Sequence, residues 1–379
     1  MTASPLLDIE NLSVTFPEAD GPDIHAVDSV DLKIEPGSIH GLVGESGSGK
    51  SVTASSIMRL LDNANINADQ FSYRDYNLLE KSEVEMQQIR GDEIGMVFQD
   101  SLSALNPIMT VGEQVAEVVR HHGDVDESTG LLSELRRKYI TGTDTESASW
   151  QRAVELLEMV GIPDPEQRAE EYPHQLSGGQ RQRVMIAQAL GGNPSLIIAD
   201  EPTTALDVTV EANILQELEN LAEEFDIAIL LITHDLGVVA ETCDTVTVMY
   251  SGSVMERAPT EQLFKQPSHP YTRGLMMSIP KYDHVEGEQL ATIPGAAPDP
   301  ADRPSGCPFR DRCPAAVNAC TDPVAEHNIS DKHISYCHLH GSEHDTRPSE
   351  LDWGSANNSD TDKQSQSVAA RIGGEANEQ

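Results

Sequence analysis

The sequence lacks any apolar run that approaches the ~18–20 residues needed to cross a bilayer. Its longest strongly apolar stretch, residues 227–232, has the length of a β-strand. Residues 1–5 also lack the basic region and the apolar core of a secretion signal. We therefore expect a cytoplasmic protein that reaches a membrane only through a partner.

Basic residues are scarce too, because 25 Lys and Arg stand against 63 Asp and Glu, for a net charge of −38. Binding to nucleic acid needs a basic patch that neutralises phosphates, and none is visible, so we expect no nucleic-acid partner. The acids are spread along the chain, a composition associated with halophiles, and we expect the source to be a haloarchaeon. A disordered acidic protein is the alternative, but 38% hydrophobic residues and several buried-strand patterns argue against it.

One segment has the phosphate-binding pattern G-x-x-x-x-G-K-[ST], with the residues Gly44, Glu45, Ser46, Gly47, Ser48, Gly49, Lys50 and Ser51. In such a loop, backbone N–H groups surround a phosphate, Lys50 approaches the β- and γ-phosphates, and the Ser51 hydroxyl binds Mg²⁺. Residues 39–43 have the pattern of a buried strand and residues 52–61 that of a helix, so the loop has the context that this chemistry requires. A chance glycine turn is the alternative, which this context disfavours.

A second segment adds two carboxylates to this site. Residues 196–199 are apolar, which is typical of a parallel strand that is buried on both faces. Asp200 at its end would lie at the carboxyl edge of the sheet and bind Mg²⁺, and Glu201 could deprotonate an attacking water. Alone, the pair would be read as a solvated turn before Pro202, but the phosphate-binding loop favours the site.

A third segment, Leu176-Ser177-Gly178-Gly179-Gln180, identifies a family. With it, the sequence resembles the ATP-binding subunits of ABC transporters from about residue 6 to residue 340. Further family marks follow in order: the Q-loop glutamine Gln99, the D-loop 204–207 with Thr204 where serine is commoner, and the switch histidine His234. The resemblance implies an α/β P-loop ATPase with an antiparallel β subdomain, a helical subdomain and a small C-terminal Cys-rich extension.

The resemblance also implies a mechanism in which two such domains pack head to tail. Each ATP then lies between the P-loop of one domain and the signature of the other, contributed here by Ser177, Gly178, Gly179 and Gln180, with Asp207 of the D-loop nearby. Glu201 would polarise the water, His234 would hold it, and Gln99 would reach Mg²⁺. Phe16 occupies the place of the aromatic residue that stacks on adenine, although its alternation with Leu12 and Val14 equally fits one face of a core strand.

The chain divides into an ABC domain at 5–280, an extension at 281–341 and a polar tail at 342–379 that we expect to be disordered. The helical subdomain spans about 100–175. Within it, 123–149 is expected to be a solvated loop with one short helix at 131–139. Residues 153–160 and 208–225 have the apolar spacing of helices.

Four of the five cysteines lie close together in the extension: Cys307, Cys313, Cys320 and Cys337. Disulfides do not persist in the cytosol, so this clustering indicates a metal. Zinc usually takes closer pairs, whereas the two Cys-Pro steps fit an iron–sulfur loop, and both metals stay open on this chemistry.

The extension also resembles that of dipeptide and oligopeptide importer ATPases, through the segments 269–272, 278–280, 306–309 and 337–339. Some members of that group carry a four-iron cluster on these cysteines. The resemblance implies import of di- or oligopeptides by an assembly of this chain, a sister ATPase, two membrane permeases and an external binding protein. The alternatives are import of nickel or another small solute, or an ABC ATPase without transport, which a single P-loop and the lack of sustained heptads disfavour.

Overall fold

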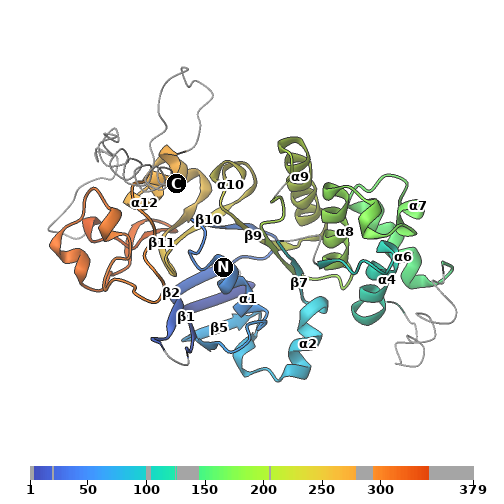
Figure 1. Ribbon diagram of the computed structural model, residues 1–379, viewed down its shortest axis with the longest axis horizontal. Helices are drawn as coiled ribbons and strands as arrows, with labels where there is room; N and C mark the ends of the chain where they lie inside the picture. Colours follow the sequence, from blue (N-terminus) through green and yellow to red (C-terminus); the bar gives the residue numbers. More distant parts are fainter. Residues whose placement is uncertain are drawn as a thin grey trace, which may run out of the picture.

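The computed structural model describes residues 4–18, 21–99, 104–123, 125, 145–204, 206–278 and 293–340. In these ranges the chain forms an antiparallel sheet, a larger and mainly parallel sheet, and a group of helices at one end of the molecule (Figure 1). The expected tail at 342–379 and the expected helix at 131–139 lie outside the described residues. Within the described ranges, no helix is both long and apolar enough to cross a membrane.

The antiparallel sheet has the strand order β2-β1-β5-β6, and β4 pairs with β1. A register shift in β1 between Ile9 and Leu12 keeps both side chains fully buried, although they are three positions apart. The strands of this sheet are β1 (Leu7–Phe16), β2 (Ile24–Ile34), β4 (Asn65–Asn67), β5 (Gln70–Tyr73) and β6 (Tyr76–Asn77).

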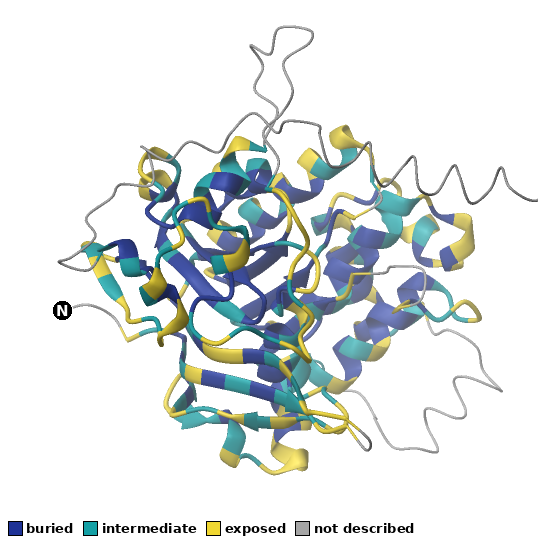
Figure 2. Ribbon diagram, turned by 60° about the vertical axis from the view of Figure 1, so that its left-hand side comes forward, coloured by how far each residue is buried: buried dark blue, intermediate teal, exposed yellow. Residues whose placement is uncertain are grey.

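The larger sheet has the strand order β12-β13-β11-β10-β3-β9-β8-β7, and β10, β3, β9, β8 and β7 run parallel. Every residue of β3, β8 and β9 is buried. Dark blue strands run through the middle of the molecule in Figure 2. Successive residues of β8 pack into different hydrophobic cores, since Ile197 belongs to one core and Ile198 to the other. The strands are β3 (Ile39–Val43), β7 (Ile94–Val97), β8 (Leu196–Asp200), β9 (Ala228–Thr233), β10 (Thr245–Tyr250), β11 (Ser253–Pro259), β12 (His327–Ser330) and β13 (His333–Ser335).

One helix begins and ends where the apolar spacing predicts, and two others differ from their predicted bounds. The expected helix at 208–225 is α9, which buries one apolar face. The helix expected at 153–160 begins earlier, because Ser147 caps it by accepting from the backbone N–H of Trp150. The helices are α1 (Lys50–Ile57), α2 (Glu83–Asp92), α4 (Val111–His122), α6 (Ala148–Met159), α7 (Pro165–Ala169), α8 (Gly178–Leu190), α9 (Val208–Phe225), α10 (Leu236–Thr242), α11 (Thr260–Lys265) and α12 (Pro270–Met277).

The helix that follows the phosphate-binding loop differs from its prediction at both ends. The helix expected at 52–61 is α1, which starts at Lys50 and stops at Ile57. Arg59 takes a left-handed conformation with φ 49°, which ends the helix, and the backbone N–H of Leu60 bonds back to the carbonyl of Ser55. The helix stops because Arg59, two residues after its end, turns the chain, a feature that apolar spacing does not encode.

The C-terminal extension (orange in Figure 1) adds to the larger sheet. Strand β13 pairs with β11, and β12 pairs with β13. Phe309 is fully buried, and its ring centroid lies 5.3 Å from that of Tyr250 and 5.2 Å from that of Tyr271. The described part of the extension therefore shares the hydrophobic core of the domain that precedes it.

Candidate active site

The phosphate-binding loop connects β3 to α1, at the carboxyl end of a central strand. Gly49 has φ 96°, a conformation that L side chains rarely adopt. At Gly44, a Cβ would lie 2.1 Å from the carbonyl oxygen of Met249, so no larger residue fits. These glycines let the loop fold tightly against β10 and turn its backbone toward the site.

Lys50 lies at the centre of this loop and is 5% exposed. Its Nζ donates to the carbonyl oxygens of Gly44 at 2.8 Å and Glu45 at 3.0 Å. Burial lowers the pKa of Lys50, although nearby carboxylates, Glu201 foremost, act in the opposite direction. The ammonium group is thus held inside the loop where a phosphate would approach.

Asp200 ends β8 beside the loop, as the sequence predicted. Its Oδ1 accepts a hydrogen bond of 3.1 Å from the Ser51 hydroxyl. Burial raises the pKa of Asp200, because removal from water disfavours the charged form. A hydroxyl and a carboxylate oxygen at this distance are ligands that Mg²⁺ prefers, so these residues fit the ion that the sequence predicts.

Glu201 is the hub of a hydrogen-bond network that joins the three residues expected to catalyse. Its Oε2 accepts from the Gln99 amide at 2.7 Å and from the Thr204 hydroxyl at 2.9 Å, and its Oε1 lies 3.2 Å from His234 Nδ1. Burial acts to raise the pKa of Glu201, but these hydrogen bonds outweigh it and lower that pKa. The carboxylate is therefore kept ionised, as a general base must be.

The backbone of Glu201 is also unusual, with φ 46°. A non-glycine residue in this left-handed region is strained, and such strain concentrates at functional sites. Its N–H donates to the carbonyl of Ile232 at 2.9 Å, which ties the residue after β8 to the neighbouring strand β9. The strained turn directs the side chain toward Gln99 and His234.

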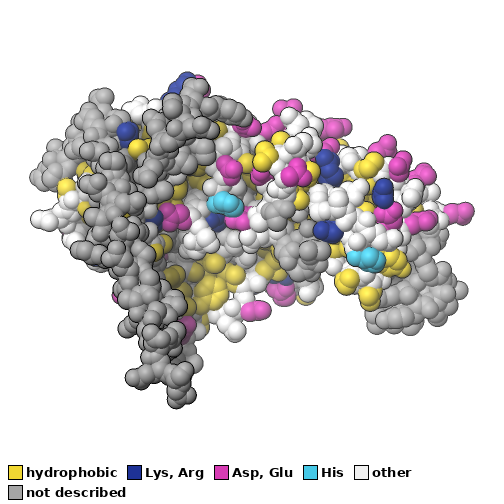
Figure 3. Space-filling view, turned by 45° about the horizontal axis from the view of Figure 1, so that its top comes forward, with side chains coloured by type: hydrophobic (Ala, Val, Ile, Leu, Met, Phe, Trp, Pro, Cys, Tyr) yellow, Lys and Arg dark blue, Asp and Glu magenta, His cyan; other side chains and the backbone are white. Residues whose placement is uncertain are grey.

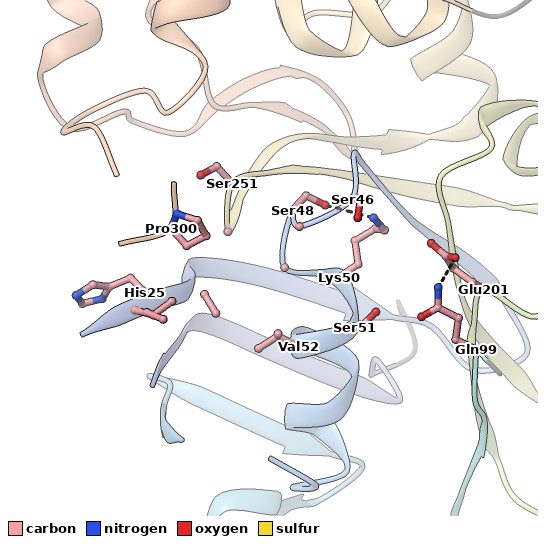
Figure 4. A pocket seen from close by; sticks show the side chains of 15 residues that line it. His25, Ser46, Ser48, Lys50, Ser51, Val52, Gln99, Glu201, Ser251 and Pro300 are labelled. Atoms are coloured by element: carbon pink, nitrogen blue, oxygen red, sulfur yellow. Dashed lines mark hydrogen bonds between the residues drawn. The ribbon is translucent and has the colours of Figure 1, made fainter. Parts of the chain in front are cut away.

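Two neighbouring pockets surround these groups. One of about 230 Å³ has Gln99 and Glu201 at one end and His25 and Pro300 at the other (Figure 4). Its lining includes the loop residues Ser46, Gly47, Ser48, Gly49, Lys50 and Ser51. The other, of about 460 Å³, is lined by Gly44, Glu45 and Ser46 together with Gln99, Glu201 and His234.

Sequence reasoning missed His25 and Pro300 in the first pocket. Phe16, expected to stack on adenine, is not among the lining residues, although its β2 partner Ile24 is. Phe16 is half-buried and packs against the core of the antiparallel sheet. His25 could have been suspected from its place on the strand paired with β1, whereas nothing in the sequence links Pro300 to the loop.

The signature residues lie apart from both pockets. Ser177 is exposed and caps α8, accepting from the backbone N–H of Gln180, whose side chain accepts from the Ser177 N–H in return. Asp207 caps α9 in the same way through the N–H of Val210. Gly179 allows α8 to approach α9, since a Cβ there would lie 2.6 Å from Val210. These residues thus lie at the exposed start of α8, away from the two pockets described above.

The four cysteines of the extension come near one another. The backbone N–H of Cys307 donates to the carbonyl of Cys320 at 2.9 Å, and Cys307, Cys320 and Cys337 are buried. Burial raises the pKa of Cys307 to about 11 and those of Cys313 and Cys337 to about 12, and repulsion between neighbouring sulfurs adds to the rise. Among the described residues, no three His, Cys, Asp or Glu side chains form a group that could hold a metal ion.

Comparison with known proteins identifies the class. The sequence matches the family described as "ABC transporter" over residues 27–204, and "Oligopeptide/dipeptide transporter, C-terminal region" over residues 255–320. A putative peptide import ATP-binding protein of Brucella melitensis is 46% identical over 339 residues, covering 89% of this chain and 96% of that protein. The oligopeptide transport ATP-binding protein AppD of Bacillus subtilis is 47% identical over 319 residues, covering 84% and 91%.

Solved structures of ABC cassettes resemble this chain in fold. The ATP-binding cassette MJ0796, described as a dimer in a post-hydrolysis state with ADP and Pi, is 30% identical with a TM-score of 0.55, covering 67% of this chain and 98% of that one. The cassette cbiO1 of Clostridium perfringens is 26% identical with a TM-score of 0.54, covering 69% and 92%.

The fold and site define an ABC cassette, and the chain belongs to the ABC transporter family of ATP-binding proteins. The expected fold class and ATP-hydrolysing activity are confirmed.

Proposed function

We propose that this chain hydrolyses ATP to power the import of di- or oligopeptides through a membrane transporter. The observation that carries the proposal is a phosphate-binding loop in which Ser51 bonds to Asp200 and Lys50 lies within the electrostatic influence of Asp200 and Glu201, in a chain whose C-terminal region matches that of oligopeptide and dipeptide transporters. The relatives at 46% and 47% identity are named for peptide import or oligopeptide transport, which supports the same solute class.

The geometry supports a role for each group. The loop N–H groups and Lys50 would hold the β- and γ-phosphates, and Ser51 and Asp200 would hold Mg²⁺. The bound ion would supply positive charge to the phosphate oxygens. Glu201 would take a proton from water as the water oxygen attacks the γ-phosphorus and the bond to ADP breaks.

Gln99 and His234 act on the same carboxylate. Their hydrogen bonds orient Glu201 toward the pocket that all three residues line. His234 is 64% exposed on its side chain, which leaves it free to contact the water or the γ-phosphate. The two residues therefore position the base and its water.

The second half of the site would come from a partner cassette. Ser177 stands exposed at the N-terminus of α8, where free N–H groups and the helix dipole favour an anion. A γ-phosphate held by another cassette is such an anion, and MJ0796 is described as dimeric. We infer a heterodimer with a sister ATPase, on the cytoplasmic face of a membrane, with two permeases and an external binding protein and without nucleic acid.

Reconstitution tests the solute class. The chain, its sister ATPase, both permeases and the binding protein are assembled in liposomes, and uptake of radiolabelled di- and oligopeptides is measured with and without ATP. ATP-dependent peptide uptake supports the proposal. Uptake of nickel but not of peptides would assign the other solute class, and ATP hydrolysis that no permease stimulates would indicate an ABC ATPase without transport.

We further propose that the four extension cysteines bind a four-iron cluster. Four thiolates can complete the ligand set of such a cluster, and Cys307, Cys313 and Cys320 lie near enough to Cys337 to raise the pKa of its thiol. Among the described residues these side chains do not form a metal-binding group, so the cluster would have to draw them together. Protein purified without oxygen should contain about four irons per chain and bleach with dithionite. One zinc and no iron per chain would replace the cluster with a structural zinc ion.

We also propose that the acidic composition reflects a high-salt habitat. Acidic side chains outnumber basic ones on the face shown in Figure 3. Excess surface charge of one sign keeps a protein soluble but opposes its compact state through self-repulsion, which salt relieves.

A further inference from the structure

The C-terminal extension reaches the nucleotide pocket, although it lies far from the P-loop in sequence. Pro300 lines the pocket at the end opposite Glu201 (Figure 4). Close by, Arg303 Nη2 donates to the Ser253 hydroxyl at 2.5 Å, which ties this part of the extension to β11. Residues 251 and 252, just before β11, line the same pocket. The extension thus forms one wall of the site.

A second contact is an ion pair that lies on the P-loop itself. The side chain of Arg312 is 9% exposed, and its Nη1 lies 2.8 Å from Glu45 Oε2, across 267 positions of sequence. The same Nη1 donates to the Tyr250 hydroxyl at 3.2 Å, and the guanidinium lies 5.6 Å from the centre of that ring. Its other nitrogens donate to the carbonyls of Ile293 and Pro294. These contacts hold the guanidinium of Arg312 in place beside the P-loop.

Glu45 is held from the backbone as well. Its N–H donates to the Tyr271 hydroxyl at 3.0 Å, and Tyr271 packs against Tyr250 with ring centroids 4.7 Å apart. Phe309, which precedes the short helix Arg310–Arg312, packs on both rings. One aromatic cluster therefore supports both partners of the ion pair.

The negative charge of Glu45 is the reason why the ion pair bears on nucleotide binding. Glu45 is a carboxylate in the loop that would surround a triphosphate, and like charges at short range oppose binding. The guanidinium of Arg312 neutralises that carboxylate, and a partly buried pair is screened by solvent less than a surface pair. Without Arg312, the loop would present a negative charge to a negative ligand.

We propose that Arg312 is a positioning residue of the nucleotide site, which neutralises and anchors Glu45 so that the P-loop binds ATP tightly. The inference rests on the proposed ATP-binding function. Because Cys313 follows Arg312 directly, the contact of Arg312 with Glu45 connects the cysteine-containing part of the extension to the P-loop. Binding of ATP and ordering of the segment 293–313 are therefore coupled, and by linkage each strengthens the other.

The test compares two neighbouring arginines in the full chain. Arg310 lies in the same short helix, but its Nη1 donates to the carbonyl of Ser305 and it does not touch the P-loop. Affinity for a fluorescent ATP analogue is measured for the wild-type protein, Arg312→Gln and the matched control Arg310→Gln. We expect Arg312→Gln to weaken binding roughly tenfold, within the usual range for coupled sites, and Arg310→Gln to bind as the wild type does.

A second substitution separates charge from folding. Adding Glu45→Gln to Arg312→Gln removes the unpaired carboxylate, so the double variant should recover most of the lost affinity. Equal binding by Arg312→Gln and Arg310→Gln, or a double variant as weak as Arg312→Gln, would overturn the inference. A wild-type chain that binds no ATP would instead overturn the proposed function, and the inference with it.

Hydrogen exchange tests the coupling in the wild-type chain, without any variant that could misfold. ATP should slow exchange of the backbone amides in 293–313, while exchange in β12 and β13, which belong to the extension but do not line the pocket, should stay unchanged. Exchange in 293–313 that ATP leaves unaltered would overturn the inference.

Discussion

At the scale of single residues, Asp200 shows that a carboxylate suited to bind a cation can lower the stability of the ligand-free chain. Burial raises its pKa, so the folded chain binds the proton of Asp200 more tightly than the unfolded chain does. The resulting stabilisation is complete at low pH and is lost as the pH rises through the raised pKa. At neutral pH the ionised carboxylate therefore destabilises the ligand-free chain. A bound cation would offset this loss of stability.

We predict that Asp200→Asn raises the melting temperature of the ligand-free chain at pH 7 and abolishes the stabilisation by Mg²⁺ and ATP. The difference from the wild type should shrink as the pH falls through the pKa of Asp200, because the wild-type carboxyl is then neutral too. Asp311→Asn, at a side chain that is 74% exposed, controls for the general gain from removing one negative charge. Equal shifts in the two variants would contradict this explanation.

The residues of the site differ in how far sequence could predict them. Lys50, Ser51, Asp200 and Glu201 belong to local patterns that bind phosphate and Mg²⁺, so they could be placed from the sequence. The contact of Arg312 with Glu45 spans 267 positions and arises from how the extension folds back. No local pattern marks such a contact, and for the same reason Pro300 could be placed only by the structure.

At the scale of elements, the N-terminus of α8 combines an observed helix cap with the contact to a partner that we propose. Ser177 and Gln180 form a capping box, which satisfies backbone N–H groups that a helix start leaves unpaired. The same turn holds the signature residues that a partner's ATP would contact. Helix α2 starts with a capping box of the same kind, formed by Ser82 and Glu85, but far from the signature in sequence.

These two caps give a matched pair of substitutions. We predict that Ser177→Ala and Ser82→Ala each lower the free energy of unfolding by about 1 kcal/mol, the usual loss for an N-cap serine. Only Ser177→Ala should also lower ATP hydrolysis in the assembled transporter. The measurements are denaturant unfolding of the isolated chain and steady-state phosphate release. Full activity of Ser177→Ala would show that this serine only caps its helix.

Prediction of the elements succeeded where one local pattern decides the structure. Strand β3 and helix α9 have the bounds that their apolar patterns predicted, 39–43 and 208–225, because burial on both faces or on one face fixes which residues are apolar. The end of α1 was wrong, because Arg59 reverses the chain by its backbone conformation rather than by its polarity.

At the scale of the whole molecule, the extension has too few large apolar residues to form a hydrophobic core of its own. Its described part instead continues the central sheet through β13 and shares the aromatic core through Phe309. A short segment can be stable in this way, because it uses the hydrophobic core of a larger domain. Composition alone does not show which core a segment joins.

The net charge of −38 makes a prediction about the whole chain. At about 0.1 M salt the Debye length is about 10 Å, so neighbouring carboxylates repel one another, whereas at 1 M it is about 3 Å. We predict that the protein melts at a higher temperature in molar KCl than in dilute buffer and loses structure on dilution. Far-UV circular dichroism during thermal unfolding measures this, and identical curves at both salt concentrations would refute the halophilic adaptation.

The measurement that tests the central claim most directly is ATP turnover by the transporter with Glu201→Gln in this chain. Glutamine keeps the shape of the side chain but cannot take the proton of water, so hydrolysis should fall by about 10²–10⁴ while ATP still binds. Lys50→Ala is the contrasting variant, because it should lose affinity for the nucleotide itself. Near wild-type turnover in Glu201→Gln would contradict the claim that this carboxylate, held by Gln99 and His234, is the base that drives hydrolysis.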